Sequence, residues 1–222
     1  MIRSLAAIFT RDLRLSLRQG GGAAAALSFI LAVLVMVPLA IGPDQALLRR
    51  LAPGIMWLTL LLAVLLTADR IFQQDYEDGS IDALVSAPQP LEIIACCKAI
   101  AHWLGVGLPL ALCAPVLALM LNIAEASIPV LMAAMLLGSL SLSLLASIGG
   151  ALTAGLRRGG LIVNLLILPL YVPVLVFGVS ASLAETTPAG ATSSLLVLLA
   201  VACLSLAVQP WAAAAALRAY LR

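Results

Sequence analysis

Six stretches of this 222-residue chain contain no Lys, Arg, Asp or Glu, and they constrain the fold more than any other feature. Each is long enough to cross the hydrocarbon core of a bilayer as a helix, which takes about 20 apolar residues. Closed β-barrels are excluded because their strands alternate in polarity and these stretches do not. The sequence therefore predicts an all-α integral membrane bundle of six transmembrane helices, one from each of the stretches 19–43, 51–68, 99–124, 126–156, 159–184 and 186–217.

The cations predict which side of the membrane each end of the chain occupies. With six spans both termini lie on one side, and that side holds ten of the twelve Lys and Arg residues. Only Arg49 and Arg50 lie on the other side. Loops rich in Lys and Arg stay in the cytoplasm. We therefore expect both termini to be cytoplasmic.

Residues 1–18 predict an interfacial helix that lies in the inner headgroup layer before the first span. On a helix, four arginines share one face and the large apolar residues share the opposite face: Arg3, Arg11, Arg14 and Arg18 against Ile2, Leu5, Phe9, Leu13 and Leu17. A frayed basic tail and a cleaved secretory signal are the alternatives. The apolar run from Ala23 to Ile41 is longer than a typical signal core, which favours an uncleaved first span.

Several kinds of chemistry lack the residues they require. Lys98 is the only lysine and Cys97 precedes it, so the chain has no G-x-x-x-x-G-K-[ST] phosphate loop for ATP. His102 is the only histidine, whereas zinc sites use three or four ligands. We expect it to hydrogen-bond to a neighbouring helix. The predicted spans offer neither a nucleophile with a base nor a pair of carboxylates, which disfavours an intramembrane enzyme.

An acidic segment interrupts this apolar chain between the second and third spans. Residues 69–98 hold six of the ten acids against Arg70 and Lys98. This balance is the reverse of what binding to anionic lipid requires. The segment is therefore expected to face protein or water at the cytoplasmic side.

Helix start and stop signals divide this segment. Gly79 is suited to end the helix that leaves the second span, and Ser80 to cap a new short helix with Asp82 in its first turn. Pro88 and Pro90 end that helix and open the next one.

The short helix carries an apolar stripe of Ile81, Leu84 and Val85. Isolated helices of barely two turns are marginal in water. A docking partner is the natural stabiliser, and a solvated loop is the alternative.

Small residues also recur every four positions in the fourth span, at Ser139, Ser143, Ser147 and Ala151. Such rows let two helices approach closely. The partner helix belongs either to the same chain, which we favour, or to a second copy.

Several segments resemble a known family. EDGSIDALVSAPQPLEII resembles the coupling-helix region of type-2 ABC exporter permeases. IGPDQALLRRLAPGIMW, KAIAHWLGVGLPL, ALTAGLRRGGLIVNLLILPLYVPVLVFG and the closing AAAALR resemble the permease subunit of the cytochrome c maturation system. Together they indicate a similarity to the haem exporter protein B (CcmB) family over nearly all of the chain.

The resemblance implies a single transmembrane permease domain over 1–222 in the bacterial inner membrane, with 69–98 as its cytoplasmic coupling region. Permeases of this kind pair as homodimers with a separate cytoplasmic ATPase subunit, which binds the ATP, and associate with a haem-handling membrane protein and a small accessory subunit. The resemblance implies that ATP hydrolysis by the ATPase subunit is coupled to the release of haem or of a haem-loaded chaperone, so haem is a possible substrate. No resident cofactor, metal or nucleic acid is expected. A scaffold subunit that does not itself move haem is the alternative.

The resemblance also implies roles for single residues. The residues expected to couple this chain to the ATPase are Asp75, Glu77, Asp78, Gly79, Ser80, Ile81, Asp82 and Leu84. Among them, Gly79 makes the turn, Ile81 and Leu84 insert into a groove of the ATPase, and the four acids meet basic groups at its rim. His102, in the AHW motif, is the candidate haem ligand.

Overall fold

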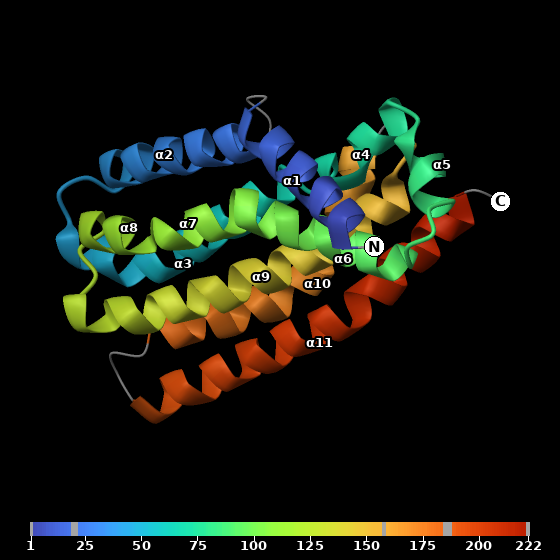
Figure 1. Ribbon diagram of the computed structural model, residues 1–222. Coiled ribbons are helices and arrows are strands. Elements are labelled where there is room, and N and C mark those ends of the chain that lie inside the picture. The colour runs from blue at the N-terminus through green and yellow to red at the C-terminus, as the bar shows by residue number, and fades with distance from the viewer. Residues whose placement is uncertain (1, 19–21, 157–158, 184–187, 221–222) are drawn as a thin grey trace.

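The computed structural model describes residues 2–18, 22–156, 159–183 and 188–220, and these ranges contain helices and turns but no strand. Six helical runs in them are long and apolar enough to cross a membrane: Gly22–Ile41, Gln45–Glu77, Leu91–Met120, Glu125–Thr153, Leu165–Ser182 and Ala191–Ala219. The long helices lie side by side as a bundle (Figure 1). The prediction of an all-α, multi-pass membrane bundle is confirmed.

The elements follow one another in a simple order. The first half contains α1 (Ile2–Arg18), α2 (Gly22–Ile41), α3 (Gln45–Leu65), α4 (Arg70–Glu77), α5 (Ser80–Val85) and α6 (Leu91–His102). The second half contains the π-helix η1 (Trp103–Gly107), α7 (Leu108–Leu112), α8 (Ala114–Met120), the 3-10 turn η2 (Glu125–Ser127), α9 (Ile128–Thr153), α10 (Gly159–Ser182) and α11 (Pro188–Tyr220).

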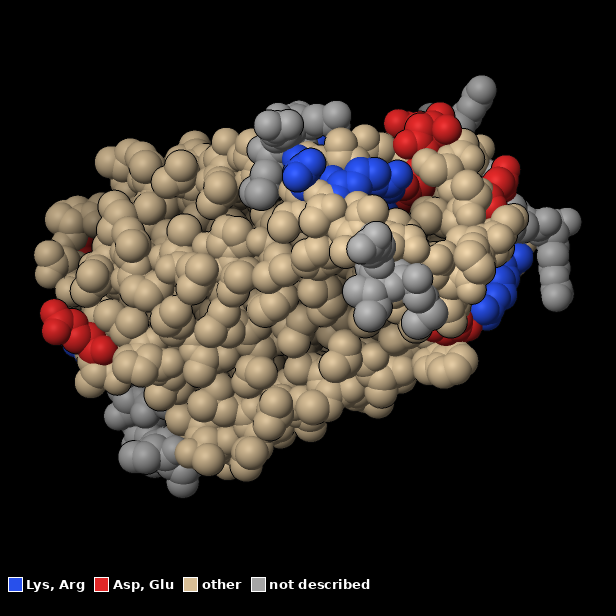
Figure 2. Space-filling model, in the orientation of Figure 1, with Lys and Arg blue, Asp and Glu red and all other residues tan. Residues whose placement is uncertain are grey.

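One end of the bundle carries α1, α4 and α5, and both ends of the chain lie there (Figure 1). We call it the charged end, because most of the Lys, Arg, Asp and Glu side chains visible in Figure 2 gather on it. The face between the two ends is almost free of charge. Large apolar side chains stand exposed on the long helices, including Leu39 on α2 and Leu165 on α10, as a surface in contact with lipid tails requires.

Helix α9 lies at the centre, packed against α10, α11, α6, α7 and α3. Its row of Ser139, Ser143, Ser147 and Ala151 is buried inside the chain, which agrees with the expectation that small residues serve internal packing.

The indole of Trp57 on α3 wedges between two glycines of the core. A Cβ added to Gly138 or to Gly178 would overlap its ring. The indole N–H donates a hydrogen bond to Ser182 Oγ at 2.9 Å. Both glycines are therefore needed because the ring lies against their backbones.

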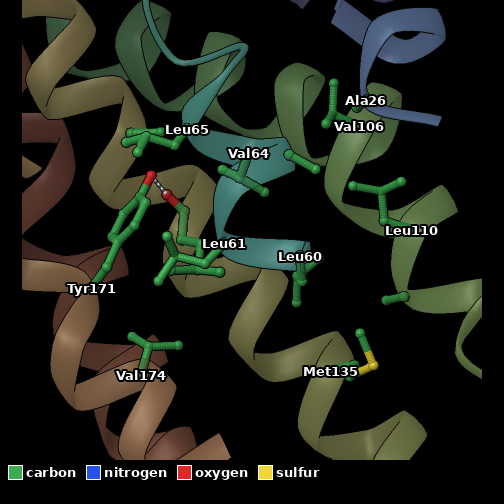
Figure 3. Packing of buried hydrophobic residues seen from close by; sticks show 14 of the residues in the cluster. Ala26, Leu60, Leu61, Val64, Leu65, Val106, Leu110, Met135, Tyr171 and Val174 are labelled. Carbon is green, nitrogen blue, oxygen red and sulfur yellow. Dashed lines mark hydrogen bonds between the residues drawn. The ribbon is translucent and has the colours of Figure 1, made fainter. Parts of the chain in front are cut away.

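Next to this wedge, apolar side chains of α3 fill the space between α7, α9 and α10, with Leu60, Leu61, Val64 and Leu65 at its centre (Figure 3). The Tyr171 hydroxyl donates to the carbonyl oxygen of Leu142 at 3.0 Å, so the one polar atom of this ring is paired.

The third span differs from the continuous apolar helix that the stretch 99–124 suggests. It begins earlier, at Leu91, widens into the π-helix η1 and is interrupted again at Cys113. Pro109 and Pro115 each lack the N–H that would bond to the preceding turn, and their rings crowd that turn. The backbone therefore departs from regular α-helix in the residues before both prolines.

Candidate functional site

The acidic segment forms two short helices at the charged end, joined by a tight turn at Gly79. Helix α4 ends at Glu77 and Gly79 has a φ of +74°, in the left-handed region that favours glycine. This confirms the prediction that Gly79 ends the preceding helix. Turns at Leu66–Asp69 separate α4 from α3, so α4 starts a new direction at the end of the second span. We call residues 70–85 the α4–α5 segment.

The turn corrects the expected role of Ser80. Ser80 is the first residue of α5, and its hydroxyl donates to the carboxylate of Asp78 instead of capping the helix. Asp78 Oδ1 also accepts the backbone N–H of Ser80 at 3.0 Å. The side chain that satisfies the start of α5 is therefore that of Asp78, since its carboxylate is the stronger acceptor.

These two hydrogen bonds, first from the Ser80 hydroxyl and then from its backbone N–H, lower the pKa of Asp78. Asp78 consequently remains negatively charged at neutral pH while lying on the surface.

The α4–α5 segment separates its predicted site residues into two groups. Glu77, Asp78 and Asp82 are exposed and Leu84 is half-buried, and we call these four the outward surface of the segment. Ile81 is 3% exposed and belongs to the core cluster of the chain. It holds α5 on the bundle and does not project toward a partner, because so short a helix needs an apolar anchor.

Asp75 is the second of the predicted ATPase-coupling residues that faces inward, and it is 1% exposed. Its carboxylate bonds to Arg11 of α1 and lies 2.7 Å from Nζ of Lys98 on α6. Lys98 Nζ is also 2.6 Å from Asp12 Oδ2, and the Arg11 guanidinium lies 3.0 Å from Asp12 Oδ1. We call Arg11, Asp12, Asp75 and Lys98 the ion quartet. Its two cations and two anions balance, as buried charges require.

Burial and the neighbouring charges shift the pKa of Arg11 in opposite directions. Burial alone would lower its pKa, but the hydrogen bond and charge of Asp75, together with Asp12, outweigh burial and raise it. The ammonium of Lys98 in addition lies 5.6 Å from the ring centroid of Phe72, which is fully buried on α4. The quartet thus joins α1, α4 and α6 by charged contacts.

Sequence reasoning missed the quartet. It treated Arg11 as one of four headgroup-facing arginines, and it used Lys98 to exclude a phosphate loop and to count charges without giving it a partner. Two signals were available: Asp12 is the one acid on an otherwise basic helix, and Lys98 is the sole lysine and follows an apolar run. A lone opposite charge on an amphipathic helix indicates an internal partner, because it gains nothing from anionic lipid.

A cavity of about 480 Å³ lies beside the quartet, between α1 and α4. Its lining includes Ser16 of α1, Gln74 of α4 and, further along the bundle, Thr67 and His102. Ligand pockets of proteins fall in this size range, about 300–1,000 Å³. Groups of three His, Cys, Asp or Glu able to hold a metal do not occur in the part of the chain that the structure describes.

His102 is engaged within the bundle. Its Nε2 lies 2.9 Å from Thr67 Oγ1, and the Thr67 hydroxyl donates to the carbonyl oxygen of Val64 at 3.0 Å. Nδ1 is buried and has no hydrogen-bond partner among the described residues. Binding a haem iron at Nε2 would displace the contact with Thr67.

Comparison with known proteins identifies the family. The family model described as "CcmB protein" matches residues 3–220. The chain belongs to the CcmB family.

Curated relatives match over nearly their whole length. Heme exporter protein B of Paracoccus denitrificans is 51% identical over 216 residues, covering 97% of this chain and 99% of the relative. The protein of the same name from Pseudomonas aeruginosa is 44% identical over 211 residues, covering 95% of each. That of Escherichia coli K12 is 39% identical over 211 residues, covering 95% and 96%. The α4–α5 segment and the ion quartet both lie within the matched range of this CcmB chain.

Proposed function

We propose that this chain is the membrane-spanning permease subunit of an ABC-type haem exporter that serves c-type cytochrome biogenesis. The relatives named heme exporter protein B support the haem export, and the six spans support the membrane role. The ATP-dependent step belongs to a separate cytoplasmic subunit, so this chain is not itself the enzyme.

The observation that carries the proposal is the exposed surface of the α4–α5 segment. Glu77, Asp78, Asp82 and the half-buried Leu84 project from the charged end, and α5 is anchored behind them through Ile81. A partner with a basic rim around an apolar groove matches this surface, because complementary charge fixes register and partner choice.

The cations at the charged end support an orientation of the chain in the membrane. Ten of the twelve cations belong to the side that carries both termini and the α4–α5 segment. Under the positive-inside rule this side is cytoplasmic, where an ATPase has access to it. Two permease chains with two ATPase subunits, a haem-handling membrane protein and a small accessory subunit complete the proposed complex in the inner membrane.

Motion enters the bundle through the spans that flank the segment. Helix α4 follows α3 after the turns at Leu66–Asp69, and α5 leads through a short loop into α6. A rigid-body push on α5 by the ATPase pair therefore tilts the second and third spans against the central α9.

The test is co-purification from mild-detergent membranes. The wild type is compared with an Asp78→Lys, Leu84→Asp variant, and with a Glu125→Lys, Ala126→Asp control that makes the same net charge change at the opposite end. The expected result is that the ATPase subunit accompanies the wild type and the control and is lost from the first variant. If no ATPase subunit accompanies the wild type, or if the first variant retains it fully, the proposal is wrong.

A second arm separates a driven permease from a passive scaffold. The complex is assembled with an ATPase subunit that cannot hydrolyse ATP, and c-type cytochrome formation is measured in cells. A driven permease predicts an intact complex and no cytochrome formation. Normal cytochrome formation in that strain would establish the scaffold instead.

A further inference from the structure

The ion quartet connects three elements that are far apart in sequence. Arg11 and Asp12 lie on α1, Asp75 on α4 and Lys98 on α6, with separations of 64 residues between Arg11 and Asp75 and 86 between Asp12 and Lys98. Asp75 and Lys98 are almost fully buried, so water weakens their pairing less than it weakens surface pairs, whereas the Arg11 side chain is 39% exposed.

Helix α1 meets the α4–α5 segment across a gap. The cavity of about 480 Å³ is lined by α1 on one side and by α4 on the other. The Arg11–Asp75 ion pair links the two helices directly beside this cavity. A second tie lies near the start of α1, where Gln89 Nε2, in the loop after α5, donates to Ser4 Oγ at 3.1 Å.

The far end of α1 lies against the irregular part of the third span. A Cβ on Gly105 of η1 would overlap the side chain of Ser16 on α1, so the two backbones approach closely. Helix α1 thus touches the α4–α5 segment at Asp75, the loop after α5 at Gln89 and the π-helix at Gly105. Single π-helical turns inside α-helices are rare and frequently occur at functional sites.

We propose that α1 is a moving part of the coupling machinery, tied to it by Arg11 and Asp12 as positioning residues. A displacement of α4 draws α1 with it through the Arg11–Asp75 pair, and α1 presses on η1 through Ser16. The proposal rests on the proposed function for the source of the motion. It assigns α1 a role in transmission in addition to its place at the membrane surface.

The first test uses single-charge variants of α1 in the full complex. Arg11→Ala removes the tie to Asp75 and leaves the Lys98 pairs in place, while Arg14→Ala removes an exposed arginine of the same helix. ATP hydrolysis and c-type cytochrome formation are both measured. Arg11→Ala is expected to retain the ATPase subunit and its hydrolysis, with about fivefold less cytochrome formed per ATP hydrolysed. An equal ratio in the two variants would overturn the proposal.

Rescue by charge exchange separates a specific tie from general damage. Arg11→Asp alone places three acids around Lys98, whereas Arg11→Asp with Asp75→Arg restores two cations and two anions. The double variant is expected to recover most of the cytochrome formed per ATP. No gain over Arg11→Asp would contradict the pairing role.

A spin-label measurement tests the tie without the partner. The four native cysteines are replaced, and nitroxides are attached at Ala7→Cys on α1 and Gln74→Cys on α4, both exposed positions. The distance distribution between them should broaden in Arg11→Ala and stay unchanged in Arg14→Ala. If the ATPase subunit fails to co-purify, the proposed function falls, but this result still decides whether Arg11 holds α1 to α4. Equal distributions would overturn the tie.

Discussion

Replacing Lys98 with Met tests the ion quartet as a stabilising element. Met keeps the apolar stem and removes the ammonium, whose Nζ lies 2.6 Å from Asp12 Oδ2 and 2.7 Å from Asp75 Oδ2. The Lys98 side chain is 3% exposed, so the two carboxylates are left with only Arg11 as counter-charge. Removing one member of a buried pair costs about 3–5 kcal/mol, because the other charge stays buried without its partner.

The assay is thermal unfolding of the detergent-solubilised protein, followed by the soluble fraction that survives heating. For a chain of this size about 1 kcal/mol shifts Tm by about 2–4 °C, so Lys98→Met should lower it by about 6–20 °C. The control is Arg218→Met, which breaks the pair with Glu92, where the Arg218 side chain is 54% exposed. Exposed pairs contribute about 0–1 kcal/mol, which corresponds to at most about 4 °C. A Lys98→Met shift no larger than that of the control would refute a buried quartet.

Three further predictions test other parts of the structure. Gly138→Ala should lower the free energy of unfolding by about 1–3 kcal/mol, because the new Cβ overlaps the Trp57 ring. In the control Gly54→Ala the new Cβ meets no atom within 4 Å, and the free energy of unfolding should rise by up to about 1 kcal/mol. Equal Tm values for the two variants would contradict this packing. Gln209→Leu removes hydrogen bonds to Ala95 O at 3.1 Å and to Ser147 Oγ at 2.9 Å. We expect the free energy of unfolding to fall by about 0.5–2 kcal/mol in the same assay, and an unchanged Tm would contradict this expectation. Gly79→Pro forces φ to about −65° at a residue whose φ is +74°, and therefore distorts the turn between α4 and α5. If this turn couples the chain to the ATPase subunit, ATP hydrolysis should continue while c-type cytochrome formation fails. Normal cytochrome levels would count against a coupling role of this turn.

The spans were predictable because a bilayer imposes one strong rule on every helix that crosses it. Each charge-free stretch supplies one of the six spans of the structure. The turn at Gly79 was predictable for a similar reason, since a left-handed residue after a short helix is usually glycine. Both predictions depend on local composition alone.

Features that depend on competition between neighbours were not predictable. Ser80 is as good a cap as Asp78 by residue type, and only the geometry of the turn gives the role to Asp78. Ile81 and Leu84 lie on one apolar stripe, but packing against the chain's own core buries Ile81 and leaves Leu84 half-buried.

The ion quartet depends on tertiary structure. Its members come from three helices, and no local pattern links Asp12 to Lys98 across 86 residues. The irregular third span was predictable only in part. Pro109 and Pro115 were visible in the sequence, but their effect on the backbone depends on the packing around them.

The most direct measurement of the central claim is photo-crosslinking from residue 84 in living cells. A photoreactive amino acid replaces Leu84 on the outward surface of the α4–α5 segment, and a second strain carries it at the exposed Ala126 at the opposite end. If the segment docks an ATPase subunit, position 84 yields an adduct with that subunit and position 126 does not. An active protein that yields no ATPase adduct from position 84, or equal adducts from both positions, would contradict the account.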